Sequence, residues 1–196
     1  MTIEVVTLRG KDLAQGIPAV ARLRMSVFRH WPYLYDGSME YETSYLSKFA
    51  QAEGAIIVAA TDGDAIVGCA TAAPLTAVEP EFATPFAERR MDVAKVFYCG
   101  ESVLLPDYRG QGLGHAFFDH REAQARALDR FTHSAFCVVV RPLDHPLRPA
   151  SYVPLDAFWS KRGYAKVDGL MAHFSWKDVD QPAETAKPMQ FWTKVL

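Results

Sequence analysis

The sequence predicts an α+β fold, a mixed and mostly antiparallel central sheet of about seven strands flanked by helices. Three observations predict it. Two apolar runs, 55–62 and 65–75, meet at an Asp-Gly turn, which indicates an antiparallel hairpin. A third run at 97–105 leads through a glycine-rich turn into a helix, as in a strand–helix–strand crossover. Two further strands, 170–179 and 189–196, close the chain.

Composition bounds the classes of protein to consider. With 196 residues, of which 49% are hydrophobic, the chain suits a single domain, 1–196, with a sizeable core. The net charge of −2 and the lack of a long basic run argue against nucleic acid as a partner. The sequence MTIEVVTLRG does not resemble a signal peptide, and no apolar run is long enough to span a membrane. We therefore expect a cytoplasmic protein.

The three cysteines, Cys69, Cys99 and Cys137, all lie in apolar, strand-like runs. They are odd in number and lack CxxC spacing. This pattern favours small buried side chains in a reducing compartment over disulfides or a metal site. We expect no metal.

The first part of the chain predicts a strand at 3–9 and helices at 17–28 and 39–50, with an aromatic loop, WPYLYDG, between the helices. The first helix has its arginines, Arg24 among them, off the apolar face. Asp36 or Ser38 can cap the second helix. The small residues of 65–75 predict close packing or a bulge, and 79–92 predicts a loop with room for one short helix.

The second part predicts a helix over about 112–129, a strand at 133–142 and a proline-stiffened loop at 143–154. Apolar residues of the helix share one face, and charged residues, including Arg121 and Glu122, lie elsewhere. Asp156 can cap a short helix that Gly163 ends. The apolar residues of 189–196 pack inside the domain or pair with a neighbour, which makes a homodimer plausible.

The glycine-rich turn has the features of a phosphate site. Glycines let the backbone approach an anion, and the N–H groups at a helix N-terminus point toward it. Arg109 adds a positive charge with planar donors. The alternative is an ordinary tight corner between a strand and a helix, so the spacing of the glycines must decide.

Three phosphate-binding patterns compete for this turn. A P-loop fails, because His115 and Ala116 stand where Gly and Lys belong. The dinucleotide pattern GxGxxG fails at the same His115. The third pattern, R/Q-x-x-G-x-G/A, is matched by the six residues from Arg109 to Gly114. At this point the sequence resembles the GNAT acetyltransferase superfamily, whose acetyl-CoA pyrophosphate loop has this motif.

A second motif, DAFWSKRGY, resembles the downstream FYxKxGF motif of the same superfamily. Together the two resemblances imply a strongly twisted GNAT sheet, acetyl-CoA as cosubstrate, and direct transfer of acetyl to a primary amine on a small molecule or a protein, in a ternary complex with a general base. Two alternatives stay open: a non-catalytic acyl-CoA-binding protein of the same fold, and a nucleotide-binding protein.

The resemblance also assigns the CoA-binding residues. The end of the strand, Val103, Leu104 and Leu105, leaves backbone groups for the pantetheine arm, and the loop binds the pyrophosphate. The loop residues are Arg109, Gly110, Gln111, Gly112, Leu113, Gly114 and His115.

Glu101 is the candidate base, because an ammonium acceptor must lose a proton before it attacks a thioester. Strand alternation puts Phe97, Cys99, Glu101, Val103 and Leu105 on one side, and apolar neighbours raise the pKa of a carboxyl group. The alternative is a structural glutamate paired with an arginine such as Arg141.

The acid for the leaving thiolate is not provided by the usual residue, because Trp159 stands where the family often has tyrosine. We expect Trp159 to pack in the core. Tyr152, Tyr98 and Cys137 are candidate replacements, with Tyr152 proposed as catalytic, and a thiolate can also leave without an acid.

The acceptor site is expected at the aromatic loop and the second helix, where the family's first two helices form one wall. Tyr33, Tyr35 and Glu101, with neighbouring Leu34, Tyr41 and Glu42, suit a cation. The alternative is a hydrophobic cluster. Arg141, with His145 and Arg148, can instead bind an acidic acceptor or the CoA 3′-phosphate.

Overall fold

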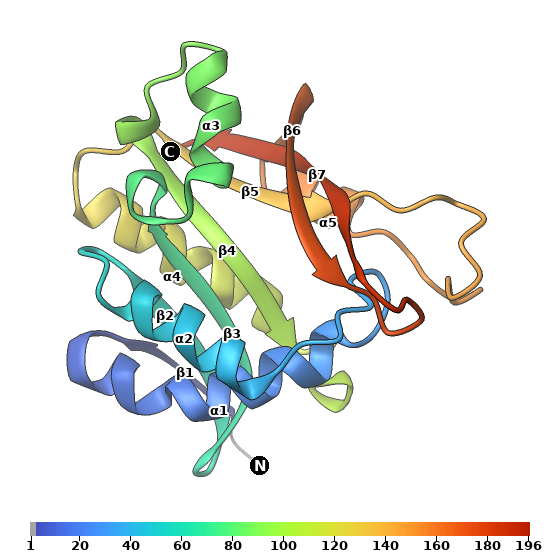
Figure 1. Cartoon of the computed structure of the whole chain (residues 1–196). Coiled ribbons are helices and arrows are strands. Elements are labelled where there is room, and N and C mark those ends of the chain that lie inside the picture. Colours follow the sequence, from blue (N-terminus) through green and yellow to red (C-terminus); the bar gives the residue numbers. More distant parts are fainter. Residues whose placement is uncertain (1–2) are drawn as a thin grey trace.

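Strands from the whole chain enter one sheet of seven strands, in the order β1-β2-β3-β4-β5-β7-β6. The structure is a computed structural model and describes residues 3–196. All neighbouring strands are antiparallel except β4 and β5. The sequence prediction of a mostly antiparallel, seven-stranded α+β fold is confirmed. The strands are β1 (Ile3–Leu8), β2 (Ile56–Asp62), β3 (Ala65–Pro74), β4 (Val96–Leu104), β5 (His133–Val139), β6 (Ala165–Lys177) and β7 (Glu184–Val195) (Figure 1).

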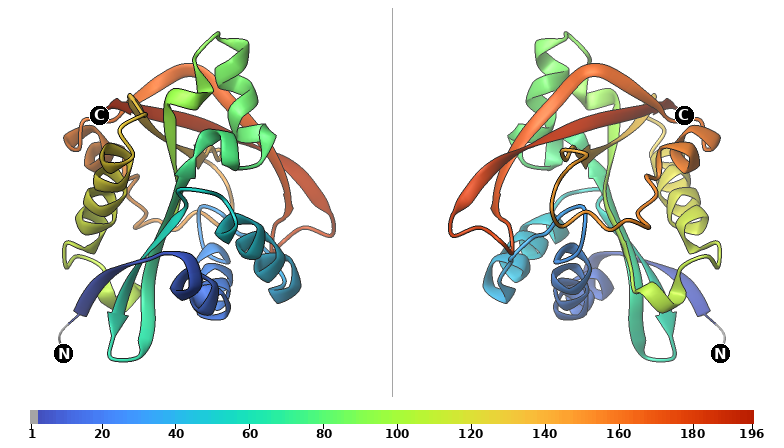
Figure 2. Two further views of the ribbon diagram at one scale, coloured as in Figure 1. Left: turned by 90° about the vertical axis from the view of Figure 1, so that its left-hand side faces the viewer. Right: turned by 90° about the vertical axis from the view of Figure 1, so that its right-hand side faces the viewer.

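Helices cover both faces of the sheet, which Figure 2 shows edge-on. α1 (Gly10–Phe28) and α2 (Met39–Ala50) lie on one face, and α4 (Leu113–Ala127) and α5 (Asp156–Lys161) lie on the other. α3 (Pro80–Glu88) is inserted between β3 and β4 and packs beside β6 through Phe82 and Phe86. β4 therefore leads into the glycine-rich turn and has a different helical layer on each side.

The β2–β3 hairpin forms as the sequence predicts. Asp62 pairs with Ala65, which leaves Gly63 and Asp64 as a two-residue turn, and Gly63 has a φ of +58°. Register shifts mark irregularities between Ala60 and Thr61 and again in β3, where close packing or a bulge was expected.

β4 and β5 pair over only three residues of each strand. Val96, Phe97 and Tyr98 face His133, Ser134 and Ala135, and within residues 3–196 the pairing does not continue beyond Tyr98. β4 remains paired with β3 as far as Leu104. The two halves of the sheet therefore separate along the second half of β4, whose edge toward β5 has no partner strand among the described residues.

Several element boundaries differ from the sequence predictions. α1 begins at Gly10, not 17, and runs through Pro18, because apolar contacts of Leu13 and Ile17 hold its first turns against the sheet. Asp156 is the first residue of α5 and makes no cap; Leu155 holds the cap position. β5 ends at Val139, three residues early, whereas β6 and β7 begin about five residues early because they pair with each other along their length.

β7 lies between β5 and β6, and Met189, Phe191 and Trp192 are buried there. The apolar residues that made a homodimer plausible thus pack inside the domain, and the homodimer stays an untested prediction. Within residues 3–196, no helix combines the length and apolar composition that crossing a membrane requires. All three cysteines are buried and unpaired.

Candidate active site

The turn between β4 and α4 presents a run of free backbone N–H groups. Gly110 and Gly112 have φ angles of +77° and +82°, which favour glycine. Gly112 is the N-cap of α4, and its carbonyl accepts from the N–H groups of His115 and Ala116. Within residues 3–196, the N–H groups of 110–114 have no hydrogen-bond acceptor. Nothing lies within 4 Å of a Cβ built on either glycine, so the space before these donors is open.

Side chains of the loop surround these donors but do not fill the space. Arg109 is exposed, and two of its nitrogens donate to the carbonyl of Leu104 at 3.3 Å. His115 is exposed beside Phe158 and lies 3.2 Å from a nitrogen of Arg162. Leu113 is buried in the core, so it can offer a ligand only its backbone. The loop can therefore bind an anion through its backbone, with Arg109 and His115 at the rim.

A bulge interrupts β4 immediately before this loop. Ala72 pairs with Cys99 and Ala70 pairs with Ser102, so Gly100 and Glu101 together face Thr71. A Cβ at Gly100 would lie 2.3 Å from Thr71 Oγ1, which explains the glycine. A bulge of this kind leaves backbone groups outside the ladder.

The bulge also corrects one sequence prediction. Phe97 and Cys99 pack beneath α4, as alternation requires, but Val103 packs beneath α1 and α2, and Glu101 reaches Arg24 of α1. The five alternate residues from Phe97 to Leu105 therefore do not share one side. The extra residue shifts the alternation by one, which turns Glu101 toward the face that holds the predicted acceptor wall.

Glu101 belongs to a buried triad of charges. Its carboxylate pairs with Nη1 of Arg24, and Nε of Arg24 donates to Glu42 at 2.5 Å. Glu42 is fully buried, and little of Arg24 or Glu101 is exposed. Burial opposes the charge of Arg24, but Glu101, Tyr45 and Glu42 raise its pKa well above the usual value. The alternative partner for Glu101, Arg141, was wrong; the arginine is Arg24.

Aromatic rings surround the triad. The guanidinium of Arg24 lies 5.1 Å from the Phe28 ring and 4.8 Å from the Tyr45 ring. Burial, with Cys137 and Glu101 nearby, raises the pKa of Tyr33. Burial and then Glu42 raise the pKa of Tyr35. The structure thus brings Tyr33 near Glu101, and Tyr35 near Glu42, in one aromatic and acidic wall.

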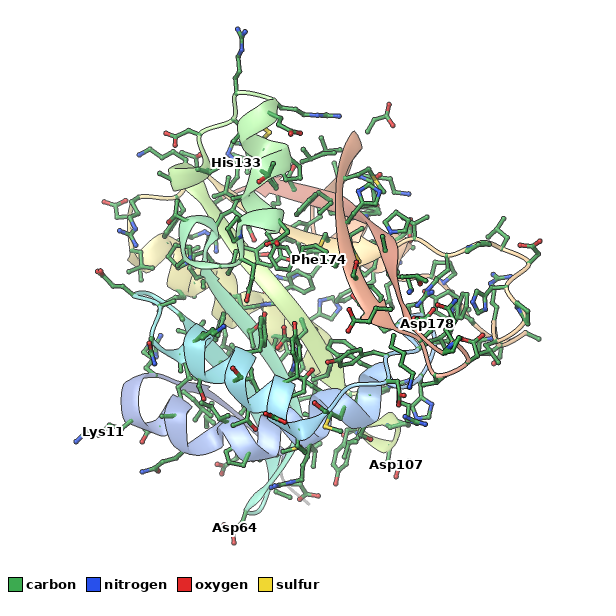
Figure 3. All side chains as sticks on the ribbon, viewed as in Figure 1. Lys11, Asp64, Asp107, His133, Phe174 and Asp178 are labelled. Carbon is green, nitrogen blue, oxygen red and sulfur yellow. The ribbon has the colours of Figure 1, made fainter. Side chains whose placement is uncertain are left out.

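Arg141 pairs with Asp178 and not with Glu101. Its guanidinium donates to both carboxylate oxygens of Asp178 at 2.6 and 2.9 Å and to the carbonyls of Pro32 and Tyr33. Asp178 is fully buried at the end of β6, beside the loop that follows α1 (Figure 3). These contacts hold the aromatic loop to the β6–β7 hairpin. Four of the five N–H donors of Arg141 are used in these contacts, which give it a structural role. That Arg141 binds an anionic substrate stays an untested prediction.

The candidates for the leaving-group acid lie apart from one another. Tyr152 packs edge-on against Trp31, with ring centres 5.8 Å apart, in the loop after β5. Tyr98 and Cys137 lie where β4 and β5 separate, with 3.1 Å between the hydroxyl and the sulfur. Burial raises the pKa of both groups. Trp159 packs on Phe136 and Trp192, as expected, with ring centres 5.1 and 5.4 Å away.

Sequence reasoning placed Arg24 and Arg121 away from the apolar helix faces and did not predict that they and Glu42 are buried. A signal was present in their spacing. Arg24 lies four residues after Val20 and four before Phe28, Glu42 lies four before Leu46, and Arg121 lies four after Phe117. Each charged residue thus continues an apolar stripe of its helix.

The comparisons with known proteins agree with this geometry. Residues 20–148 match the model of the acetyltransferase (GNAT) family. No curated protein matches the sequence.

Solved structures similar to this one share its whole fold at low sequence identity. A ribosomal-protein-alanine N-acetyltransferase from Brucella melitensis is 12% identical with a TM-score of 0.61, and the match covers 100% of both chains. An acetyltransferase from Thermus thermophilus is 13% identical with a TM-score of 0.59, covering 100% of this chain and 98% of the other. The PaiA N-acetyltransferase from Thermoplasma acidophilum, in complex with coenzyme A, is 12% identical with a TM-score of 0.54, and both chains are fully covered. At such identities these likenesses show the fold.

Proposed function

Because the chain belongs to the GNAT acetyltransferase family, we propose that it transfers acetyl from acetyl-CoA directly to a primary amine, with Glu101 as general base. The observation that carries the proposal is the position of Glu101. It lies on the bulge of β4, the strand that leads into the glycine-rich turn, and it pairs with Arg24 of α1 in the aromatic wall.

The free N–H groups of 110–114 support binding of the CoA pyrophosphate, with Arg109 and His115 beside it. The unpaired edge of β4 supports binding of the pantetheine arm, which can add to the sheet as a strand does. Val103, Leu104 and Leu105 contribute through their backbone. In this arrangement the thioester reaches the gap between β4 and β5, next to Glu101. Coenzyme A bound to the PaiA N-acetyltransferase of the same fold is consistent with this proposal.

An ammonium acceptor must lose two protons in the reaction, one before its nitrogen attacks and one after. A protonated amine gives a proton to Glu101, directly or through water, and the neutral nitrogen attacks the acetyl carbon. A C–N bond forms, the C–S bond breaks, and the electron pair leaves on sulfur. The CoA thiolate then takes a proton from solvent, and Glu101 passes its first proton to solvent. The N-protonated amide gives its second proton to the regenerated carboxylate.

Glu101 is already paired with Arg24 when an acceptor arrives. The guanidinium of Arg24 pairs with the carboxylate of Glu101 and fixes the position of that group in the wall. An ammonium acceptor that approaches Glu101 shares the carboxylate with Arg24, and the rings of Tyr33 and Tyr45 suit a cation. We propose a cationic amine acceptor on this basis.

A non-catalytic acyl-CoA-binding protein is the second candidate. Two observations favour it: Trp159 replaces the family's tyrosine inside the core, and Glu101 is tied to Arg24. In that case the turn would still bind CoA, but no amine would be acetylated.

Two measurements test the proposal. Calorimetry with acetyl-CoA, CoA, NAD and ATP should show binding of the first two alone. Release of free thiol from acetyl-CoA should then depend on an added amine in a panel of monoamines, diamines, amino acids and peptides with a free N-terminus. Binding of acetyl-CoA without turnover of any amine would favour the second candidate. Absence of acetyl-CoA binding would contradict both.

A further inference from the structure

A buried guanidinium lies behind the bulge of β4, on the face opposite Glu101. Arg121 of α4 is 1% exposed and is the largest fully buried side chain in the part of the chain that the structure describes. Within residues 3–196 it has no carboxylate within 4 Å, although burying an unpaired charge is costly. Packing alone does not explain why a charged residue is buried at this position.

The contacts of Arg121 explain its position. Its Nη1 lies 3.5 Å from the carbonyl of Thr71 and 3.3 Å from the carbonyl of Glu101, and its Nε donates to its own helix at Phe117. Thr71 and Glu101 are the residues that face each other across the bulge, where the ladder is interrupted. Arg121 therefore provides donors to carbonyls at the bulge.

One nitrogen of Arg121, with both of its N–H donors, is still unused. Nη2 is buried and has no hydrogen-bond partner among the described residues. The guanidinium is also 4.4 Å from the Phe118 ring, which holds it in place from the helix side. On the other face of the sheet, Arg24, Glu42 and Glu101 together carry one net negative charge. The bulge thus separates a buried cation from a buried anion.

We propose that Arg121 is a positioning residue for acyl transfer. It fixes the peptide groups of residues 100–102, so that the bulge presents its unpaired backbone groups to the gap between β4 and β5. Its charge also favours the negative charge that develops first on the thioester oxygen and then on sulfur. This second part rests on the proposed function, whereas the fixing of the bulge does not.

The charge of Arg121 matters because Trp159 cannot protonate the leaving sulfur. As the C–N bond forms and the C–S bond breaks, an electron pair moves to sulfur, and the amine proton goes to Glu101. Arg121 exchanges no proton in these steps. It makes the thiolate a better leaving group through its field, which little water screens at a buried position.

The test compares Arg121→Met and Arg121→Lys with a matched control, Lys194→Met. Lys194 is a largely buried cation that anchors the same helix through Glu122 at 2.8 Å and does not touch the bulge. Hydrogen exchange of the peptide 96–105 is measured first, without ligand. We expect exchange of the bulge amides to rise about tenfold in Arg121→Met, less in Arg121→Lys, and not at all in the control.

Two measurements with acetyl-CoA follow. The carbonyl stretch of bound [1-¹³C]acetyl-CoA should lie at lower frequency in the wild type than in Arg121→Met, because the fixed bulge polarises the carbonyl. Turnover with an accepted amine should fall about 10²-fold in Arg121→Met with the KM for acetyl-CoA within about twofold of wild type. Arg121→Lys should recover part of the rate.

Unchanged exchange of 96–105 in a folded Arg121→Met protein would overturn the proposal, whatever the protein binds. If that variant does not fold, unchanged exchange in Arg121→Lys overturns it. Faster exchange combined with wild-type turnover and carbonyl frequency would overturn the part that concerns acyl transfer. If the bulge loosens as expected but the wild type neither binds acetyl-CoA nor acetylates amines, the proposed function fails and the positioning of the bulge stands.

Discussion

The two sides of the candidate site are built in different ways. The turn of residues 109–115 offers mainly backbone N–H groups, made available by two glycines, and its exposed side chains make few contacts. The proposed acceptor wall instead consists of buried side chains from distant elements, with Arg24 of α1 placed between Glu42 of α2 and Glu101 of β4. The geometry of the turn depends on a short stretch of sequence, whereas the geometry of the wall depends on the whole fold.

This difference has a consequence for specificity. A backbone cradle binds the pyrophosphate that every acyl-CoA carries, so it selects the cosubstrate class and little else. A wall of packed and ion-paired side chains can reject an amine of the wrong charge or shape, because each change leaves a buried group unpaired. We therefore expect changes to the wall to alter turnover or stability, and changes to the turn to alter CoA affinity.

Glu101→Gln is the substitution with the largest expected effect. Glutamine keeps the shape but cannot accept the amine proton, so turnover near neutral pH should fall by about 10²–10⁴. Part of the rate should return at high pH, where the amine loses its proton unaided. Acetyl-CoA affinity should not change, because the turn is untouched. The pH–rate profile and a calorimetric titration of both proteins measure these outcomes.

Glu42→Gln is the matched control, because it breaks the other half of the same triad and leaves the base in place. If both variants lose turnover to the same extent, the loss comes from the triad's structure and Glu101 is not the base. Near-normal turnover of a stable Glu101→Gln protein would move the base to water or another residue.

Arg141→Met tests whether the ion pair with Asp178 stabilises the aromatic loop of the wall. Removing one partner of a buried ion pair leaves Asp178 with Lys187, 3.5 Å away, as its one cation within residues 3–196, so unfolding should cost about 3–5 kcal/mol less. Adding Asp178→Asn should restore part of that stability, since the stranded charge is gone. Urea unfolding measures both. A stable Arg141→Met protein that fails only with acidic acceptors would support the anion-binding interpretation of Arg141.

The sequence predicted the turn better than the wall for physical reasons. The motif from Arg109 to Gly114 sets its own backbone conformation, so a local pattern suffices. The direction of Glu101 depends on a bulge whose need for Gly100 arises from Thr71, a residue on another strand. Alternation along β4 alone could not reveal it.

The second error in the sequence predictions concerned charged residues that continue the apolar stripe of a helix. Arg24 and Arg121 were placed outward because charge usually marks a solvated helix face, yet both are buried. Their partners, Glu101 and the bulge carbonyls, belong to distant parts of the chain. A charged residue that continues an apolar stripe is therefore a useful sign of a buried polar site, but the sequence does not name its partner.

Gly112→Val tests the turn. Valine would hold its side chain in the open space before the N–H groups and would not adopt a φ of +82° without strain. We expect CoA affinity to fall about 10²-fold or more, with the fold retained. Gly63→Val is the control, because Gly63 also has a positive φ and open space but lies in the β2–β3 turn. Calorimetry showing equal CoA affinity for both variants would reject the assignment of the turn.

The smallest expected effect concerns Cys137, beside Tyr98 at the point where β4 and β5 separate. Burial raises the pKa of this thiol to about 12, whereas an unfolded chain loses the proton near pH 8.5. Between these values the folded protein binds the proton that the unfolded chain releases, so stability falls as pH rises. At pH 9.5 the loss should be about 1.4 kcal/mol relative to neutral pH.

Cys137→Ala should be less stable at pH 7 because of the lost packing, but its stability should fall less steeply from pH 8 to 9.5. Urea unfolding across this range measures the two slopes. If the stability of the two proteins falls with the same slope, the thiol of Cys137 ionises in the folded protein as it does in water. The packing around Cys137 and Tyr98 would then admit water, unlike the buried side chains of the wall.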